Sequence, residues 1–429
     1  MIDTTAILIL LGLFAVLIVF GVQIAYAMLI SSIVSIFYLG LSPITIVTTL
    51  VDGLSGFTFL AIPFFILTGE IMAQGGISDK LIDFSKALVG WMRGGLAMVN
   101  IVASTFFGGI SGSASADTAS LGTILIPMMK KDGYDGEFST AVTMASSVQG
   151  LLIPPSHNMV IFAMAAGGLS VGKLFMGGLI PGLFLGIILM VFTYFVSIKR
   201  NYPKGEKFCL KALYKSFKET IWGLFTVLIV VVGVVAGIFT ATEAAAISTL
   251  YAFIITFFVY KEIPLSHFTK ILKKSLNTLS IVLMLIASAG TFGFVITYLK
   301  VPMFVANTIL GFTSNPIIIL LLINLILLFL GMIMGMASII VIMTPILLPI
   351  VAQIGVDPIQ FGAILILNCG IGLLTPPVGG VLFIGSGVSG IKIEKIVKEM
   401  IPFYIVMFFA LMCVTFIPAI TMTIPNMMG

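Results

Sequence analysis

The chain has 429 residues, 60% of them hydrophobic and 9% charged, and its mean hydropathy is +1.25. A soluble protein of this size needs a charged surface, which 21 basic and 16 acidic side chains cannot supply. The formal net charge of +5 comes from basic residues in a few loops between long apolar runs, so it does not indicate a nucleic-acid-binding protein.

The composition therefore predicts an all-α polytopic membrane protein, embedded in a lipid bilayer. The opening stretch MIDTTAILILLGLF has no basic residue and no small-residue cleavage site, so we expect a first span and not a signal peptide. The loop after the third predicted span carries Lys80, Lys86 and Arg93, and the positive-inside rule places this loop in the cytoplasm. Three spans separate it from the N-terminus, which we therefore expect in the periplasm. Apolar runs long enough to cross the hydrocarbon layer predict spans near 5–21, 23–39 and 57–74.

The apolar stretch at about 94–130 has glycines at its middle and basic residues at both ends. Because both ends are basic, both should lie in the cytoplasm, and the stretch should turn back within the membrane. We therefore predict a re-entrant helical hairpin with its tip in the sequence FFGGISGSASADTASLG.

A second irregular element follows at about 137–166, where GLLIPPS places two adjacent prolines in an apolar run. Proline supplies no N–H, so nearby carbonyls lose their helical partners. Such backbone is tolerated at membrane depth only where it is buried in protein or lines a cavity. The prolines predict a broken helix whose free carbonyls suit a hard monovalent cation. The alternative interpretation is a packing kink without an ion.

The hairpin tip and the break together supply candidate ligands for one cation. Ser111 and Ser113 lie where one half-helix of the hairpin should end and the next begin. Their hydroxyl oxygens, with carbonyls near Gly150, Ile153 and Pro155, would complete one shell. The alternative is that small residues at the tip only let two half-helices pack closely.

Polar residues of the same two elements are candidate substrate contacts. Asp117 is a carboxylate at membrane depth, where a charge is costly and indicates a functional site. Its possible roles are to tune the cation site, to order the serines or to take part in proton coupling. We group it with Ser115 and with Ser156, His157 and Asn158, which open the half-helix after the break, because a helix N-terminus attracts anions. A lone histidine is more often a satisfied polar group, so that alternative remains for His157.

The second half of the chain repeats the first at a constant offset of 222 residues. The sequence GLLIPPS returns as GLLTPPV, Gly109 returns as Gly331, and Pro127 returns as Pro349. A common offset over so long a stretch indicates an internal duplication. We predict a first repeat at 1–200, a basic cytoplasmic linker at 201–222 and a second repeat at 223–429, with a hairpin at about 314–351 and a broken helix at about 358–388.

The loop charges of the second repeat indicate the opposite orientation in the membrane. The uncharged sequence IVAQIG follows its hairpin, and no basic residue follows Lys398, so both the hairpin entry and the C-terminus should be periplasmic. Inverted-topology repeats with broken helices are the architecture of many secondary transporters. The candidate ligands of a second cation site lie at the equivalent elements: Gly331, Gly335, Gly372, Thr375 and Pro377.

Four ordered motifs, FFGGISGSASADTASLG, GLLIPPS, GIFTATEAAA and GLLTPPVG, make the chain resemble a known family across nearly its whole length. It resembles the large membrane subunit, of the DctM type, of tripartite ATP-independent periplasmic (TRAP) transporters. The resemblance implies an elevator mechanism with a scaffold and a transport domain, coupling to Na+, and a substrate such as sialic acid or a C4-dicarboxylate. It also implies a small four-helix membrane subunit, here a separate chain, and a periplasmic substrate-binding protein. In that family the cation ligands match Ser111, Ser113, Gly150, Ile153 and Pro155 and the repeat-related positions.

The sequence thus predicts sodium-coupled uptake of an organic acid across the bacterial inner membrane, with two or more Na+ ions, by a transporter and not an enzyme. No arginine lies in the apolar spans, which favours a monocarboxylate rich in hydroxyls, such as sialic acid, by a small margin. One alternative is a proton- or sodium-coupled carboxylate transporter or antiporter that works without a binding protein. A channel or an ATP-driven permease subunit explains the hydrophobicity but not the paired hairpins and breaks, and the chain has no GxxxxGK[ST] loop.

Overall fold

The computed structural model of the chain describes residues 3–56, 60–205, 207–313 and 315–428. Among these, seven helices of at least 18 residues are long and apolar enough to cross a membrane, and a bent pair adds an eighth candidate. The prediction of an all-α polytopic membrane protein is confirmed. The predicted span at 57–74 and the predicted hairpin at 314–351 begin on residues 57–59 and 314, which lie outside the described residues.

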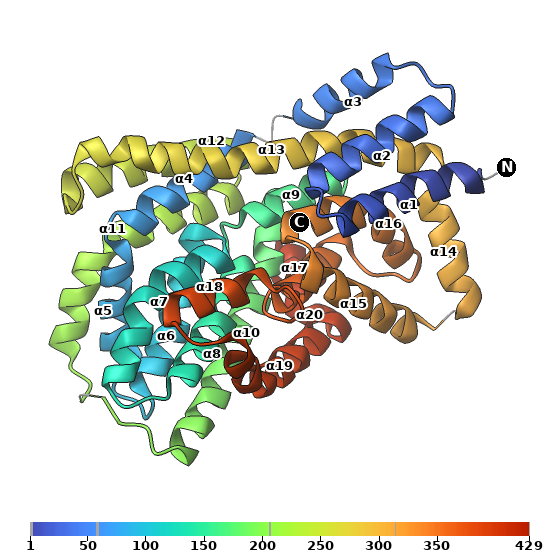
Figure 1. Cartoon of the computed structure of the whole chain (residues 1–429). Coiled ribbons are helices and arrows are strands. Elements are labelled where there is room, and N and C mark those ends of the chain that lie inside the picture. The colour runs from blue at the N-terminus through green and yellow to red at the C-terminus, as the bar shows by residue number, and fades with distance from the viewer. Residues whose placement is uncertain (1–2, 57–59, 206, 314, 429) are drawn as a thin grey trace.

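The first half of the chain forms ten helices among its described residues (Figure 1). They are α1 Thr4–Val19, α2 Ile24–Tyr38, α3 Ile44–Leu54, α4 Ala61–Gln74, α5 Ile77–Val89, α6 Gly95–Ser111, α7 Ala114–Lys131, α8 Gly136–Ser147, α9 His157–Ala165 and α10 Val171–Lys199.

The second half forms ten more within the described part. They are α11 Leu210–Val235, α12 Ala241–Ile254 with a π-helical end at Ile255–Tyr260, α13 Phe268–Tyr298, α14 Val301–Phe312, α15 Pro316–Ile333, α16 Met336–Gln353, α17 Pro358–Gly372, α18 Gly380–Ser389, α19 Ile393–Phe416 and α20 Pro418–Met427.

Helix boundaries follow the sequence offset. Helix α7 begins at Ala114 and α16 at Met336, while α8 begins at Gly136 and α17 at Pro358, which in both cases is 222 residues later. In each half a hairpin of two helices (α6–α7, α15–α16) precedes a helix broken at two prolines (α8–α9, α17–α18). The predicted fold of two repeats, each with a hairpin and a Pro-Pro broken helix, is confirmed.

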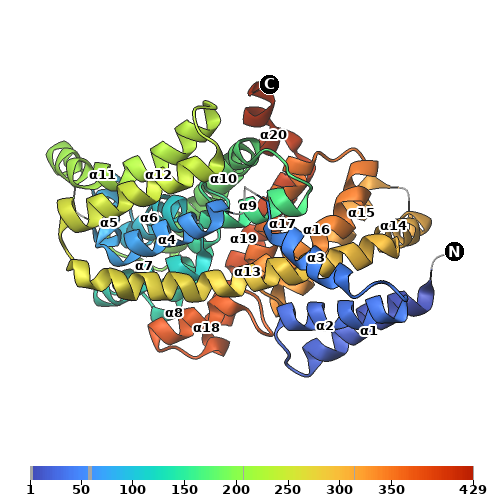
Figure 2. The same ribbon diagram turned by 90° about the horizontal axis from the view of Figure 1, so that it is seen from above.

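The hairpins and broken helices pack against one another, and other helices lie along one side of them. Helix α13, with 31 residues, runs along one side and contacts α2, α3, α4 and α16 (Figures 1 and 2). In the central body α8 packs on α6 and α7, and α17 packs on α15 and α16. Between the repeats, α9 packs on α16, and α18 packs on α7 and α8, so the two repeats meet around the elements that carry the predicted sites.

The motif GIFTATEAAA is the start of α12. The Thr240 hydroxyl accepts a hydrogen bond from the Glu243 backbone N–H (3.2 Å), and the Glu243 carboxylate accepts one from the Thr240 N–H (2.8 Å). This reciprocal capping box satisfies two backbone donors that have no partner within the helix. The glutamate of this motif therefore has a structural role at the helix terminus.

Two segments expected as loops are helical. Residues Ile77–Val89, which contain Lys80 and Lys86, form α5, and α11 begins at Leu210, inside the predicted linker at 201–222. In α5 the apolar side chains recur at helical spacing and are buried, while its charged residues lie on the other face. The sequence analysis used the lysines of this segment only to predict its side of the membrane, and it did not predict an amphipathic helix. Helix α5 is bent by 71° from α4.

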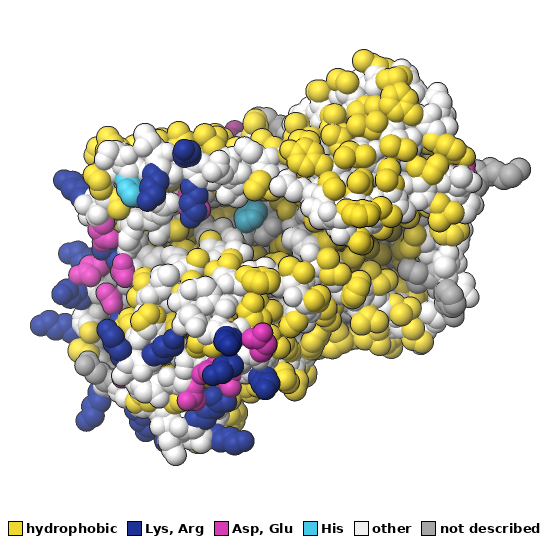
Figure 3. Space-filling model, in the orientation of Figure 1, with side chains coloured by type: hydrophobic (Ala, Val, Ile, Leu, Met, Phe, Trp, Pro, Cys, Tyr) yellow, Lys and Arg dark blue, Asp and Glu magenta, His cyan; other side chains and the backbone are white. Residues whose placement is uncertain are grey.

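Charged side chains gather at one end of the molecule. In Figure 3 lysines, arginines and carboxylates lie over α5, α11 and the neighbouring loops, while the opposite end of this face is mostly hydrophobic. Such a surface is typical of a protein surrounded by lipid, with one end in contact with water.

Candidate cation and substrate site

The first hairpin turns at a single glycine. Helix α6 ends at Ser111, Gly112 has a left-handed φ of +60°, and α7 follows with Ser113 as its N-cap. The Ser113 hydroxyl accepts a hydrogen bond from the Ala116 backbone N–H at 3.3 Å. A glycine is needed at the turn because a side chain is strained at this φ. The turn therefore leaves Ser111 and Ser113 on either side of the hairpin tip, as predicted.

The first broken helix leaves a short stretch of irregular backbone inside the protein. Helix α8 ends at Ser147, a single 3₁₀ turn covers Gln149–Leu151, and α9 begins at His157. The peptide bond between Pro154 and Pro155 is cis, and all the residues of this stretch are buried. Buried carbonyls of such a stretch need partners from elsewhere in the protein or from a ligand.

The hairpin lies directly on the break. A β-carbon on Gly108 would be 2.2 Å from the Gly150 α-carbon, so the two backbones touch and neither position has room for a side chain. At the tip, a β-carbon on Gly112 would be 3.1 Å from the Pro155 carbonyl oxygen. The Asn158 side-chain amide donates to the Gly112 carbonyl at 3.3 Å. The structure thus brings the serine turn and the proline break together.

Asp117 is fully buried beside this contact. Its Oδ1 accepts a hydrogen bond from the Ser104 hydroxyl (3.0 Å), which also lies 2.9 Å from the hydroxyl of Ser146 on the broken helix. Its Oδ2 is buried and has no hydrogen-bond partner among the described residues. That oxygen lies 3.6 Å from the position of a β-carbon on Gly150. The carboxylate therefore directs an unpaired oxygen toward the break.

Other predicted site residues lie around this point. The Ser156 hydroxyl is buried without a hydrogen-bond partner in the described part of the chain. Ser115 and His157 are half-buried, and the His157 Nδ1 is 3.3 Å from the position of a β-carbon on Gly112. The side chain of Ile153 packs on Gly109, with its Cγ2 3.4 Å from the corresponding β-carbon position.

The second hairpin contacts its own break in the same way. A β-carbon on Gly372 would be 2.6 Å from the Gly331 α-carbon, and the peptide bond between Pro376 and Pro377 is cis. The Thr375 hydroxyl donates to the Ile371 carbonyl at 2.8 Å and keeps lone pairs for a further contact.

The tips of the two hairpins differ. The backbone N–H groups of Val378 and Gly379 donate to the Met332 carbonyl at 3.3 and 3.2 Å. Gly335 has no heavy atom within 4 Å of its β-carbon position, so a side chain there would meet open space. The second site is therefore more open at its tip than the first.

Several polar residues of the site were not predicted. Ser104 and Ser146 link Asp117 to the broken helix, and in the second repeat Asn368 donates to the Asn324 side-chain oxygen at 2.8 Å. The Asn368 Oδ1 is buried without a partner among the described residues. In the sequence, each of these polar residues interrupts an apolar stretch, and this was the signal by which they could have been found. Only the packing shows which of them face each other.

The described residues fit a hard cation better than a transition metal. No group of three or more His, Cys, Asp or Glu residues lies together in the part of the chain that the structure covers. Buried oxygens of Asp117, Ser156 and Asn368 have no hydrogen-bond partner among the described residues, and Asp117 and Ser156 lie at the first break. Half-helix ends and unwound carbonyls are the groups that coordinate Na+ in secondary transporters.

Known proteins resemble the chain over nearly its full length. Residues 11–420 match the family model described as "Tripartite ATP-independent periplasmic transporter, DctM component". The isethionate TRAP transporter permease protein DctMQ of Oleidesulfovibrio alaskensis is 40% identical over 96% of this chain and 65% of its own length. The sialic acid TRAP transporter large permease protein SiaM of Vibrio cholerae is 39% identical over 88% of both chains.

A solved structure with low sequence identity has the same fold. The YdaH transporter of Alcanivorax borkumensis superposes with a TM-score of 0.63, at 13% identity, over 86% of both chains. At this identity the likeness concerns the fold alone.

Proposed function

The chain belongs to the DctM family of large permease subunits of TRAP transporters, and on that premise we propose that it takes up an organic acid by coupling to Na+. Members of this family are transport proteins and not enzymes. Hydropathy and family together place the chain in the bacterial inner membrane as a multi-pass protein. The N- and C-termini lie in the periplasm in our proposal, since the lysine-rich segments lie in the cytoplasm.

The observation that carries the proposal is the unpaired Oδ2 of Asp117 beside the first break. A carboxylate oxygen without a partner is costly in a buried site, and a bound cation removes that cost. We assign the first Na+ to Ser111, Ser113 and the carbonyls of the break, with Asp117 setting the local field. The second Na+ is assigned to Thr375 and the carbonyls near Gly372.

The same arrangement supports an elevator mechanism. The hairpins and broken helices pack on one another through backbone contacts at Gly108–Gly150 and Gly331–Gly372, so they can move as one body. The helices around them, including α13, form the static scaffold in our proposal. The scaffold meets the moving body at Gly69 of α4, whose β-carbon position lies 3.3 Å from the Ser111 α-carbon.

The substrate is an organic acid of the sialic acid or C4-dicarboxylate class. Ser115, Ser156, His157 and Asn158 lie at the hairpin tip and at the start of α9, where helix N-termini attract a carboxylate.

Neither arginine of the chain is available to the substrate. Arg200 pairs with Asp135 (3.1 Å) and Glu399 (2.6 Å), and Arg93 donates to Asn201 at 2.8 Å. A carboxylate at the site is therefore held by hydroxyls and amides, which favours a monocarboxylate rich in hydroxyls.

The family implies two partners, a small membrane subunit and a periplasmic substrate-binding protein. We propose that the small subunit is a separate four-helix chain. The DctMQ relative is longer than this chain, which covers 65% of it. The binding protein delivers the substrate to the periplasmic side of the hairpins.

Uptake into proteoliposomes tests the proposal. Both membrane subunits are reconstituted, the cognate binding protein is added outside, and accumulation of labelled sialic acid and labelled succinate is followed under an inward Na+ gradient. We expect accumulation of one acid, dependent on the gradient and on the binding protein. Accumulation without the binding protein would favour a carboxylate transporter or antiporter, and flux without accumulation would favour a channel.

A further inference from the structure

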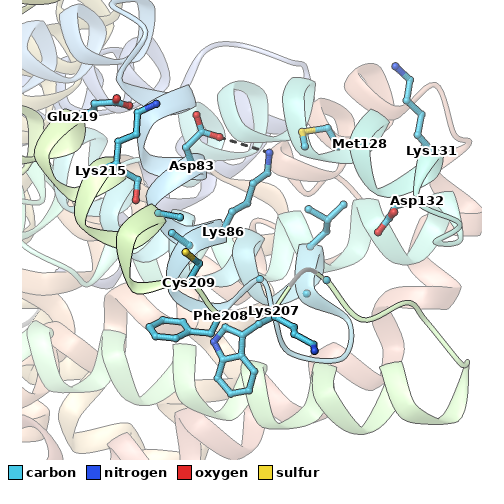
Figure 4. Close-up of a pocket in the computed structure, with 18 residues that line it drawn as sticks. Asp83, Lys86, Met128, Lys131, Asp132, Lys207, Phe208, Cys209, Lys215 and Glu219 are labelled. Carbon is cyan, nitrogen blue, oxygen red and sulfur yellow. Dashed lines mark ion pairs between the residues drawn. The ribbon is translucent and has the colours of Figure 1, made fainter.

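A pocket of about 700 Å³ opens at the charged end of the molecule, away from the hairpin tips. Helix α5, the end of α7, the start of α11 and the segment before α11 surround it (Figure 4). Four lysines line it: Lys86, Lys131, Lys207 and Lys215.

The pocket carries an excess of positive charge. Lys86 is engaged with Asp83 at 3.7 Å. Within the described residues, no carboxylate lies within 4.0 Å of the amines of Lys131, Lys207 and Lys215. The pocket contains three carboxylates in all, one fewer than its lysines. Three amines are therefore available to an anion.

An apolar groove of about 670 Å³ adjoins this pocket on the same two helices. Along α5, Lys86 lines the pocket, whereas Phe84 and Leu88 line the groove. On α11 the groove is lined by Leu210 and Tyr214, which are 71% and 70% exposed. The pocket and the groove meet at the start of α11, since Cys209 lines the first and Leu210 the second.

The position of this surface indicates what covers it. The first turns of α11 have one basic face and one apolar face, which is typical of a helix lying in a membrane interface. Trp91, which also lines the pocket, is 47% exposed, and tryptophan is enriched at the level of lipid headgroups. Basic pockets between helices on the cytoplasmic side bind anionic headgroups, and an adjoining apolar groove matches acyl chains.

We propose that this surface is a binding site for one anionic phospholipid of the cytoplasmic leaflet. The phosphate lies among Lys131, Lys207 and Lys215, and the acyl chains lie against Leu210 and Tyr214. Because Lys131 belongs to the first hairpin and Lys215 to α11, the bound lipid joins the hairpin to the surrounding helices. The proposal depends on the pocket and groove and not on sodium coupling.

Lipid retention by the purified full-length chain tests the proposal. Protein from nanodiscs of phosphatidylglycerol or of phosphatidylcholine is transferred to detergent, and bound lipid is counted by native mass spectrometry. We compare the wild type with the triple variant Lys131→Gln, Lys207→Gln, Lys215→Gln. A matched control carries Lys199→Gln, Lys392→Gln and Lys398→Gln, three exposed lysines outside the pocket. A further variant, Leu210→Ser with Tyr214→Ser, removes the apolar contacts.

We expect one phosphatidylglycerol per wild-type chain and no comparable retention of phosphatidylcholine. The triple variant should lose about a hundredfold in lipid affinity, since each of its three lysines contributes about fivefold, and the control should not. The serine variant should also lose lipid. Soluble sn-glycerol 1-phosphate should not displace the lipid, because it has no acyl chains.

Four results would overturn the proposal. Equal retention of both lipids would show that the site does not select an anionic headgroup. A triple variant that matches the control would show that the three lysines do not bind the lipid. Displacement by millimolar glycerol phosphate would assign the pocket to a soluble anion. Loss of the lipid on co-expression with the small membrane subunit would show that the surface is a subunit interface.

Discussion

Replacing Gly108 by alanine should separate the first hairpin from the proline break. The new β-carbon would lie 2.2 Å from the Gly150 α-carbon, a backbone atom that no rotamer change can move. The hairpin must therefore retreat by about 1 Å to restore ordinary van der Waals contact. Overpacking of this kind costs about 1–3 kcal/mol. Since a cation shell tolerates little displacement of its oxygens, the Na+ concentration for half-saturation should rise at least about tenfold.

Gly293→Ala is the matched control for this substitution. Gly293 also lies within an α-helix, α13, but has no heavy atom within 4 Å of its β-carbon position. Alanine is favoured over glycine in a helix by about 1 kcal/mol, so this variant should be neutral or more stable. The two variants make the same chemical change and are expected to shift stability in opposite directions.

The assay is thermal unfolding of the purified chain in detergent, titrated with NaCl against KCl at constant ionic strength. A ligand that binds only the folded state raises the unfolding temperature with its concentration. The wild type and Gly293→Ala should show this rise with Na+, and Gly108→Ala should show it only at much higher Na+. A Gly108→Ala protein with the wild-type sodium response would refute the assignment of the ion to this contact.

Further substitutions test individual groups of the two sites and the topology. Asp117→Asn keeps the shape of the side chain and removes its charge, so uptake should need at least about tenfold more Na+; an unchanged titration would assign the carboxylate to another role. Ser113→Ala removes a candidate oxygen and an N-cap worth about 1 kcal/mol, so the sodium requirement should rise while the protein still folds, and unfolding curves separate the two effects. Thr375→Val is nearly isosteric and should raise the sodium requirement several-fold, whereas the two-site assignment fails if only the substrate KM changes. In a chain whose native cysteines are replaced, a cysteine at Lys131 should react with impermeant reagents from the cytoplasm and one at Gln353 from the periplasm, and labelling from one side only would contradict inverted repeats.

The helices and their breaks could be predicted from the sequence because their signals are local. Two adjacent prolines end a helix wherever they occur, and a glycine-rich stretch between basic ends turns back. Because the offset of 222 residues is constant, a helix boundary in one repeat predicts the corresponding boundary in the other. Helix α5 was missed because its lysines suggested a loop, although its apolar residues recur at helical spacing.

The partners of the site residues could not be predicted. The sequence places Asp117 at membrane depth but does not show that Ser104 donates to it or that its second oxygen faces Gly150. These contacts depend on how α6, α7 and α8 are rotated against one another. The two tips also differ, since the β-carbon position of Gly112 is 3.1 Å from the Pro155 carbonyl oxygen, whereas that of Gly335, the counterpart of Ser113, meets open space.

Equilibrium binding of radioactive Na+ to the purified chain tests the central claim most directly. We predict two saturable sites per chain that unlabelled Na+ displaces and K+ does not, with the affinity of one site lowered in Asp117→Asn and that of the other lowered in Thr375→Val. No displaceable binding, or the same two sites in both variants, would contradict the claim that the proline breaks hold sodium.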